Sequence, residues 1–391
     1  CITVTFKMPP PKLVIVTTVP ITLTGILANQ PKFLAEHFAV SIISSPDEEL
    51  KQVEITENVP TYAVAMERGI SLFKDLVSLL KMIKQLRKLK PEIVHSYTPK
   101  SGLITMLAGF ICRVPIRVHT FTGLIFPTST GIKQKILIWM DRLICACATT
   151  IVPEGNGVKQ DLINYGITKK ELNVIGHGNI AGVDTDYFNR DVVVNEGTDS
   201  KLRIQLNLPK DAFLFCFVGR FTSDKGFSEL IAAFNKLPEN AHLVLVGEMD
   251  KRIPLPPDTI KALKQHSRIH NLGWQNDIRP ALTISDVLVL PSYREGFPNT
   301  PLQAGAMQLP CIVSDINGCN EIITPNVNGW LVPPKNSDSL FNAMLKSMNA
   351  DNLVELGNNA RANIEHSFEK SAHWQNMLGF YTDQLSKLNK H

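Results

Sequence analysis

Two basic side chains, Arg220 and Lys225, follow an apolar run in the stretch Phe217–Gly226 (FVGRFTSDKG). The run predicts a buried strand, and Gly219 permits a tight turn directly after it. The turn would present a guanidinium and an ammonium beside the free backbone amides at the start of the next helix. Such a group binds phosphate oxygens, so the stretch predicts a diphosphate site. The alternative is a pair of solvated surface charges.

A carboxylate, Glu295, follows a second apolar run in the stretch Leu290–Gln303 (LPSYREGFPNTPLQ). The run predicts a strand whose carboxyl end delivers Glu295 to the edge of a sheet, where a carboxylate can accept hydrogen bonds from sugar hydroxyls. Gly296 and Phe297 would place backbone amides beside it, and a helix begins near Asn299. The alternative is a charge that stabilises the start of this helix.

The elements that position these residues alternate between short apolar runs and amphipathic helical patterns. Alternation of this kind predicts parallel sheets with crossover helices. We expect strands at 13–17, 40–44, 93–95, 116–120, 149–152, 173–175, 213–218, 241–246, 269–272, 287–290, 311–314 and 330–332. A length of 391 residues exceeds one ordinary core. The chain therefore predicts an α/β protein with two doubly wound, Rossmann-like domains and a ligand cleft between them.

The domain boundaries follow from composition. We expect an N-terminal domain at 1–184, a polar and acidic linker at 185–200, a C-terminal domain at 201–365, and a final helix at 366–391 that packs back on the first domain. Asp184-Thr-Asp186 has the form of a metal-binding D-x-D motif, but it lies at the expected linker, and we assign it no metal.

Charge is unevenly distributed, although the net charge is only +4. Residues 58–150 contain thirteen Lys and Arg against four Asp and Glu, which suits an anionic small molecule or membrane surface better than nucleic acid. The helical patterns at 72–90 and 131–145 carry many of these charges among apolar residues. We expect core packing to account for most of those apolar residues, with docking on an anionic bilayer as the alternative. No run of 18 apolar residues occurs.

The motifs together resemble a known family. V-G-R-x₄-K-G at 218–226, V-G-E at 246–248 and P-S-x₂-E-G-F-P-N at 291–299 look like the retaining family 4 glycosyltransferases of the GT-B fold. Members that build capsular or lipopolysaccharide repeat units are the most similar. The segments 95–102, 182–188, 309–315 and 328–332 extend the resemblance over nearly the whole chain.

The resemblance implies a site for a nucleotide-sugar donor. Arg220 and Lys225 would neutralise the donor diphosphate as the glycosidic bond breaks, and Glu295 would hold the sugar hydroxyls. Gln303 stands where the family has a second Glu that holds the ribose, and an amide oxygen can still accept that hydrogen bond. The residues expected to contact the donor are Gly219, Arg220, Lys225, Gly273, Trp274, Glu295, Gly296, Phe297, Asn299, Thr300 and Gln303.

The resemblance also implies a histidine in the first domain. The matching position holds Thr122, so we consider His119, three residues earlier, and His95, at the end of a predicted strand. His95 is the stronger candidate for an acceptor contact. A structural role is the alternative for both.

The sequence thus predicts an enzyme that moves a hexose or N-acetylhexosamine, with retention, from a UDP-linked donor to a glycan or polyprenyl-diphosphate-linked acceptor in surface polysaccharide biosynthesis. We expect no cofactor, no metal and no nucleic-acid partner. We place the chain in the cytoplasm, with peripheral contact at the inner face of the cell membrane. The alternatives are a nucleotide-sugar epimerase of the same fold and a catalytically silent sugar-nucleotide binding protein.

Overall fold

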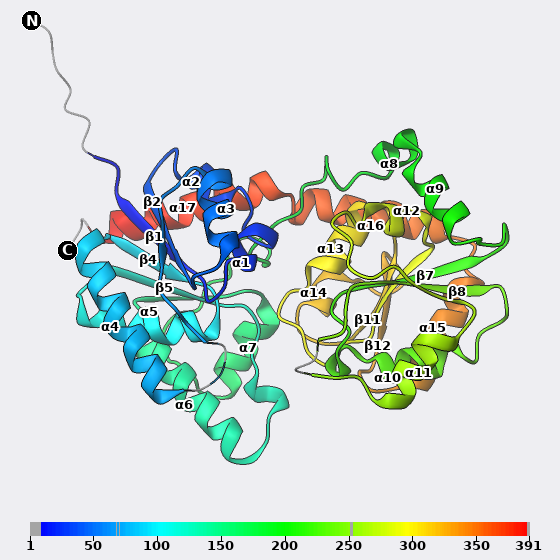
Figure 1. The fold of residues 1–391 in the computed structure, drawn as a ribbon, viewed down its shortest axis with the longest axis horizontal. Coiled ribbons are helices and arrows are strands. Elements are labelled where there is room, and N and C mark those ends of the chain that lie inside the picture. Colours follow the sequence, from blue (N-terminus) through cyan, green and yellow to red (C-terminus); the bar gives the residue numbers. More distant parts are fainter. Residues whose placement is uncertain (1–8, 68, 70, 251–252, 389–391) are drawn as a thin grey trace, which may run out of the picture. The chain divides into compact units, whose positions relative to one another are not determined.

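The computed structural model describes residues 9–67, 69, 71–250 and 253–388 (Figure 1). The chain divides into two compact units. The first runs to Ala181 and includes the C-terminal segment from Ala372, and the second runs from Gly182 to Ser371.

The first unit is built on a parallel sheet in the order β3-β2-β1-β4-β5-β6. Its strands are β1 (Lys12–Val16), β2 (Ala39–Ser44), β3 (Thr61–Ala63), β4 (Ile93–Ser96), β5 (Ile116–Phe121) and β6 (Thr150–Pro153). Its helices are α1 (Ile21–Gly25), α2 (Gln30–Leu34), α3 (Glu48–Glu57), α4 (Leu72–Leu89), α5 (Pro99–Ile111), η1 (Phe126–Thr128), α6 (Gly131–Cys147), α7 (Asn156–Asn164) and most of α17 (Lys370–Leu388).

Helices cover both faces of this sheet because its strands are apolar on both sides. On β1, Val14 and Val16 pack into a core that α4, α5 and α6 complete. Leu13 and Ile15 point to the opposite core, which contains Tyr381 of α17. This division follows from the alternation of side chains along a strand. The last helix, α17, therefore contributes to the core of the first unit.

The second unit repeats the architecture with the order β12-β11-β10-β7-β8-β9. Its strands are β7 (Phe213–Val218), β8 (Ala241–Val246), β9 (Ile269–Asn271), β10 (Val287–Leu290), β11 (Cys311–Ser314) and β12 (Gly329–Val332). Its helices are α8 (Arg190–Glu196), α9 (Thr198–Gln205), η2 (Ser223–Lys225), α10 (Phe227–Phe234), α11 (Pro257–Gln265), α12 (Arg279–Ile284), α13 (Asn299–Ala306), α14 (Cys319–Ile322), α15 (Ser337–Met348) and α16 (Leu353–Ser367).

Both sheets have the doubly wound order, in which the direction of winding reverses between two central strands. These are β1 and β4 in the first unit and β7 and β10 in the second. Ligands of doubly wound folds bind at the carboxyl ends of the strands at such a reversal. The fold class predicted from the sequence is confirmed for each unit.

Three details of the sequence prediction are wrong. The segment 185–200 is not a linker, because it contains α8 and the start of α9, and both helices pack against α12 of the second unit. The strand expected at 173–175 does not form, and only an isolated bridge joins Leu172 to Ile151. The edge strand β3 was not expected, because it has three residues and none of them is buried.

Candidate active site

Four neighbouring strands of the second sheet end beside residues of the predicted donor site and beside Asp250, which was not predicted. Glu295 follows β10, Arg220 and Lys225 follow β7, Asp250 follows β8, and Trp274 follows β9. The strands β10, β7, β8 and β9 are adjacent and parallel, so their carboxyl ends lie at one edge. The sheet therefore gathers side chains that are up to 75 positions apart in the sequence.

Lys225 and Glu295 form an ion pair across the point where the winding reverses. The Lys225 Nζ donates to Glu295 Oε1 at 2.5 Å, and the two side chains are 17% and 12% exposed. A charge-assisted hydrogen bond in such a partly desolvated place is stronger than one on the surface. Partial exposure leaves room for a ligand to approach both groups. The pair places one cation and one carboxylate at the position expected for a ligand.

Two glycines allow the loops of this site to approach each other. Gly226 has a φ of +72°, and a Cβ there would collide with the carbonyl oxygen of Pro291. Gly318 has a φ of +75°, and a Cβ there would collide with the carbonyl oxygen of Gly296. Only glycine adopts such a left-handed conformation readily and tolerates the contact. The glycines thus fix the loop that carries Glu295 against its neighbours.

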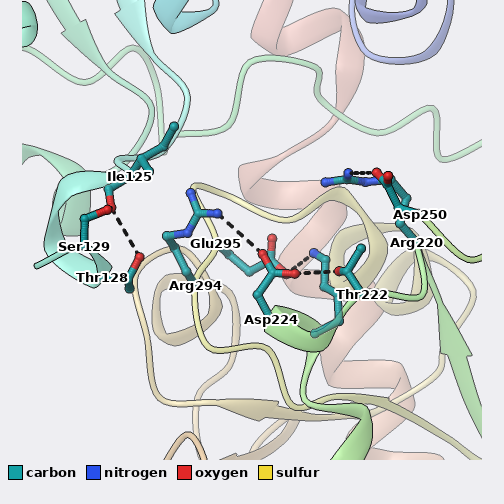
Figure 2. Close-up of polar contacts among 10 residues, drawn as sticks. Ile125, Thr128, Ser129, Arg220, Thr222, Asp224, Asp250, Arg294 and Glu295 are labelled. Atoms are coloured by element: carbon teal, nitrogen blue, oxygen red, sulfur yellow. Dashed lines mark hydrogen bonds and ion pairs between the residues drawn. The ribbon is translucent and has the colours of Figure 1, made fainter. Parts of the chain in front are cut away.

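Arg220 lies at the start of the loop after β7, five residues before Lys225, and forms a different ion pair. Its Nη1 contacts Asp250 Oδ2 at 2.7 Å, where the arginine is exposed and the carboxylate is largely buried (Figure 2). Arg220 and Asp250 line a cavity of about 540 Å³. The remaining lining residues are Val218, Gly219, Val246, Gly247, Glu248, Met249, Trp274, Gln275 and Ile278. The cavity is thus lined by apolar side chains together with the charged residues Arg220, Glu248 and Asp250.

Trp274 gives this cavity an aromatic wall. Its side chain is exposed, and its Nε1 donates to Asn276 Oδ1 at 3.3 Å. Gly273 precedes it with a φ of +66°, and the Gly273 carbonyl accepts from the amide of Gly247 at 2.8 Å. An exposed indole beside apolar side chains is a suitable surface for stacking a planar heterocycle. Trp274, which we expected to contact the donor, therefore lines the same cavity as Arg220.

Sequence reasoning missed a polar network that surrounds Lys225. Asp224 accepts from Thr222 Oγ1 at 2.5 Å and pairs with Arg294 at 3.4 Å (Figure 2). The backbone amide of Tyr293 donates to the Asp224 carbonyl at 2.8 Å. These contacts tie the loop after β7 to the loop after β10. The available signal was the position of the two charged residues, because Asp224 precedes Lys225 and Arg294 precedes Glu295 in the sequence.

Two family models match the chain. Residues 32–178 match the "Glycosyl transferase 4-like domain", and residues 198–364 match "Glycosyl transferases group 1". The capsular polysaccharide biosynthesis glycosyltransferase CapM of Staphylococcus aureus is 31% identical over 368 residues, which cover 93% of this chain and 94% of CapM. The chain belongs to family 4 of the glycosyltransferases.

A second curated relative and a solved structure are also similar to the chain. The UDP-Gal:alpha-D-GlcNAc-diphosphoundecaprenol alpha-1,3-galactosyltransferase of Escherichia coli is 32% identical to this glycosyltransferase over 326 residues, or 81% of this chain and 82% of the relative. The crystal structure of Anabaena HepE with UDP and glucose matches with a TM-score of 0.80 at 18% identity, covering 95% of this chain and 100% of HepE. At that identity the likeness shows the fold alone. The glycosyltransferase has the predicted GT-B fold.

The other predicted donor residues lie at the start of α13. Phe297 is buried against Phe368, with ring centroids 5.5 Å apart, so its side chain is structural. Thr300 Oγ1 donates to the Val218 carbonyl at 3.4 Å and fastens the helix to β7. Asn299 and Gln303 are half-buried on the same helix. Contacts of the Gly296 and Phe297 amides with a donor, and of Gln303 with the ribose, stay predictions.

The glycosyltransferase buries both candidate histidines of the first unit. His95 is fully buried, with Nδ1 2.6 Å from Tyr381 Oη and Nε2 2.7 Å from Thr120 Oγ1. His119 is also buried, with Nδ1 2.8 Å from Ser96 Oγ. The prediction that His95 contacts the acceptor is therefore wrong. Strand β4 is covered on both faces, and both ring nitrogens of His95 are hydrogen-bonded within the protein.

The burial also fixes the charge of these rings. Burial, aided by neighbouring His119, holds the pKa of His95 well below its ordinary value. Burial lowers the pKa of His119 to about 3. Both imidazoles are thus neutral near pH 7 and have structural roles. The winding of this sheet reverses between β1 and β4. Thr18 follows β1 and Thr98 follows β4, and their hydroxyl oxygens lie 2.5 Å apart.

Proposed function

We propose that this glycosyltransferase transfers a hexose or N-acetylhexosamine from a UDP-linked donor to a polyprenyl-diphosphate-linked or other glycan acceptor, with retention of anomeric configuration, in surface polysaccharide biosynthesis. Two relatives support the proposal by their names. CapM acts in capsular polysaccharide biosynthesis. The Escherichia coli relative uses UDP-Gal and an acceptor linked to diphosphoundecaprenol.

The observation that carries the donor assignment is the pairing of Lys225 with Glu295 beside a cavity that contains Arg220 and Trp274. A UDP-sugar has a planar base, a diphosphate and a polyhydroxylated ring. The indole of Trp274 suits the base, and the cations of Arg220 and Lys225 suit the diphosphate. The Glu295 carboxylate suits sugar hydroxyls, and Lys225 holds it in place. The three parts of the donor thus meet three kinds of side chain at one sheet edge.

The chemistry follows from where charge develops. As the bond between the sugar C1 and the diphosphate oxygen breaks, its electrons pass to the leaving UDP. The acceptor hydroxyl oxygen bonds to C1, and its proton leaves with the diphosphate or with solvent. Arg220 and Lys225 then face more negative charge than in the ground state, and such differential stabilisation lowers the barrier.

The same two cations underlie the proposal that transfer needs no metal ion. Other glycosyltransferases can use a divalent cation to neutralise a leaving diphosphate. Here a guanidinium and an ammonium occupy the loop after β7. The D-x-D segment does not lie in that loop, and Asp184 Oδ1 accepts from the amide of Tyr187 at 2.9 Å in a local turn.

A polyprenyl-linked acceptor is anchored in a membrane. The proposal therefore places the glycosyltransferase at the inner face of the cell membrane, where nucleotide sugars are supplied from the cytoplasm. Among the described residues, no helix has the length and the apolar composition that a bilayer span requires. The contact would be peripheral.

The proposal is tested by incubating the purified chain with a panel of UDP-sugars and a short-chain prenyl-diphosphate-linked sugar. We expect a product whose mass increases by one hexosyl or N-acetylhexosaminyl unit, and the proton coupling of its new glycosidic bond should show the donor's anomeric configuration. Conversion of the donor without acceptor would indicate an epimerase instead. Binding of UDP without transfer to any acceptor of the panel would favour a silent binding protein.

A further inference from the structure

Helix α4 exposes a row of large apolar side chains in its first half. Phe73 is 78% exposed, and Leu76, Val77 and Leu80 are exposed as well. Their spacing of three or four residues places them on one face of the helix. Met82 and Leu86 of the same helix are buried in the core. The helix thus has a second apolar stripe that the core does not use.

Helix α6 has a matching stripe. Ile132 is 78% exposed and Trp139 is 64% exposed, with the exposed Ile136 between them. The positions i, i+4 and i+7 share one face. We expected core packing to account for most apolar residues here, and that expectation is wrong for these three. Ile144, at the opposite end of the helix, is buried as expected.

The two stripes lie on the same layer of the first unit. Helices α4, α5 and α6 cover one face of its sheet, and α5 packs against both of the others (Figure 1). Each of these helices follows a strand and runs back antiparallel to it, so its first half lies toward the carboxyl ends of the strands. A largely buried ion pair between Asp75 and Lys100, 2.7 Å apart, fastens the start of α4 to α5. The stripes are therefore held on a rigid layer.

Basic side chains surround the stripes. On α4, Lys81 and Lys84 are exposed, as is Lys74, which pairs with Glu67 at 2.6 Å, and on α6, Lys133 and Lys135 are exposed. The acidic residues of the two helices are few. Asp75 is neutralised by Lys100, and burial raises the pKa of Asp141 to about 7. The layer thus combines exposed apolar and aromatic groups with a positive surround.

We propose that this layer, the α4/α6 surface, docks on an anionic phospholipid bilayer. It is defined by Phe73, Leu76, Leu80, Ile132, Ile136 and Trp139. The apolar and aromatic groups would enter the boundary between headgroups and acyl chains, and the lysines would contact lipid phosphates. A second protein copy is a poorer occupant, because it would bring two positive surfaces together. The inference depends on these side chains alone and not on the donor or acceptor.

The test is flotation of the full chain with vesicles of phosphatidylglycerol and phosphatidylcholine, compared with phosphatidylcholine alone. We expect binding to the anionic vesicles at low salt that weakens at high salt, since the lysines act through a screened attraction. The variants Leu80→Ser with Ile132→Ser, and Lys133→Gln with Lys135→Gln, should each bind at least tenfold more weakly. Ile204→Ser removes a side chain that is 76% exposed on α9 of the second unit, and it should bind like wild type.

Trp139 supplies a second readout. Its emission should shift to shorter wavelength on adding anionic vesicles, and the shift should disappear in Trp139→Phe. The proposal is overturned if the wild type does not float at low salt or if the α4/α6 variants float as it does. It is also overturned if they instead abolish a self-association of the chain that occurs without lipid. Because the substituted side chains are exposed, the melting temperatures of the variants should match that of the wild type and confirm that they fold.

Discussion

Lys225 follows β7 and Glu295 follows β10, the two strands between which the winding of the second sheet reverses, and their ion pair links the two loops with 2.5 Å between Nζ and Oε1. In the proposed donor site, this pairing gives each residue a second function. Lys225 can face a diphosphate while it orients a carboxylate, and Glu295 can face a sugar while it holds the lysine. Partial burial strengthens both effects, because few waters compete for the charges.

Gly226→Ala should damage this arrangement. The alanine would have to adopt a φ of +72° and would collide with the carbonyl of Pro291, so the loop after β7 should move away from Glu295. We expect a loss of stability clearly above the roughly 1–2 kcal/mol of a left-handed alanine, together with loss of transfer activity. Gly197→Ala is the control, because its φ is +66° but nothing lies within 4 Å of the added Cβ. Equal unfolding free energies for the two variants would show that the close approach is unimportant.

Trp274→Ala should weaken nucleotide binding. Loss of a stacking surface costs about 1–3 kcal/mol per base, which corresponds to roughly a 5- to 150-fold higher Kd for UDP. Titration calorimetry with UDP measures this directly. Trp139→Ala removes an exposed tryptophan of the first unit and should leave the Kd unchanged. An unchanged Kd in Trp274→Ala would show that the base of UDP does not stack on Trp274.

Chelation should leave transfer unaffected. If Arg220 and Lys225 neutralise the leaving diphosphate, the rate in excess EDTA should match the rate in its absence, and added Mg²⁺ or Mn²⁺ should not raise it. The initial rate of sugar transfer is the measurement. An enzyme that loses its activity in EDTA and regains it with one divalent cation would contradict this part of the proposal.

Stability should fall in mild acid because of the buried histidines. His119 has a pKa lowered to about 3, whereas an unfolded histidine titrates near 6.5. Between these values the unfolded chain binds the proton and the folded chain does not, so the free energy of unfolding falls as the pH drops from about 6.5 toward 3. In His119→Gln the slope should decrease by up to about 1.4 kcal/mol per pH unit. Denaturant titrations at several pH values measure it, and an unchanged slope would contradict the assigned burial effect.

The sequence predicted the sheets well where strands are continuous apolar runs. The bounds of β7, β8, β10 and β11 match the expected ones, because turns with Gly or Pro delimit these runs. The prediction failed for short segments that bury few side chains. Strand β3 is a short, half-exposed edge, and α8 and α9 are short polar helices whose packing on α12 no periodicity reveals.

The candidate site was predictable as a set of residues but not as a geometry. Motif spacing identified Arg220, Lys225 and Glu295. The pairing of Lys225 with Glu295 depends on strand order, which makes β7 and β10 neighbours. Arg220 pairs with Asp250, which lies two residues after the V-G-E motif and was not singled out from the sequence. His95 was misplaced for a similar reason, since a strand end at a sheet edge can still be covered by a distant helix such as α17.

In the proposed function, two cations of the loop after β7, Arg220 and Lys225, stabilise the leaving diphosphate. The most direct measurement is kcat for sugar transfer at saturating UDP-sugar in Arg220→Ala and Lys225→Ala. Lys236→Ala serves as the control, because Lys236 is an exposed cation paired with Asp338 on the surface. We expect kcat to fall on the order of 10²–10³-fold in the first two variants and to stay at the wild-type value in the third. A kcat within twofold of wild type in both Arg220→Ala and Lys225→Ala would contradict this role of the two cations.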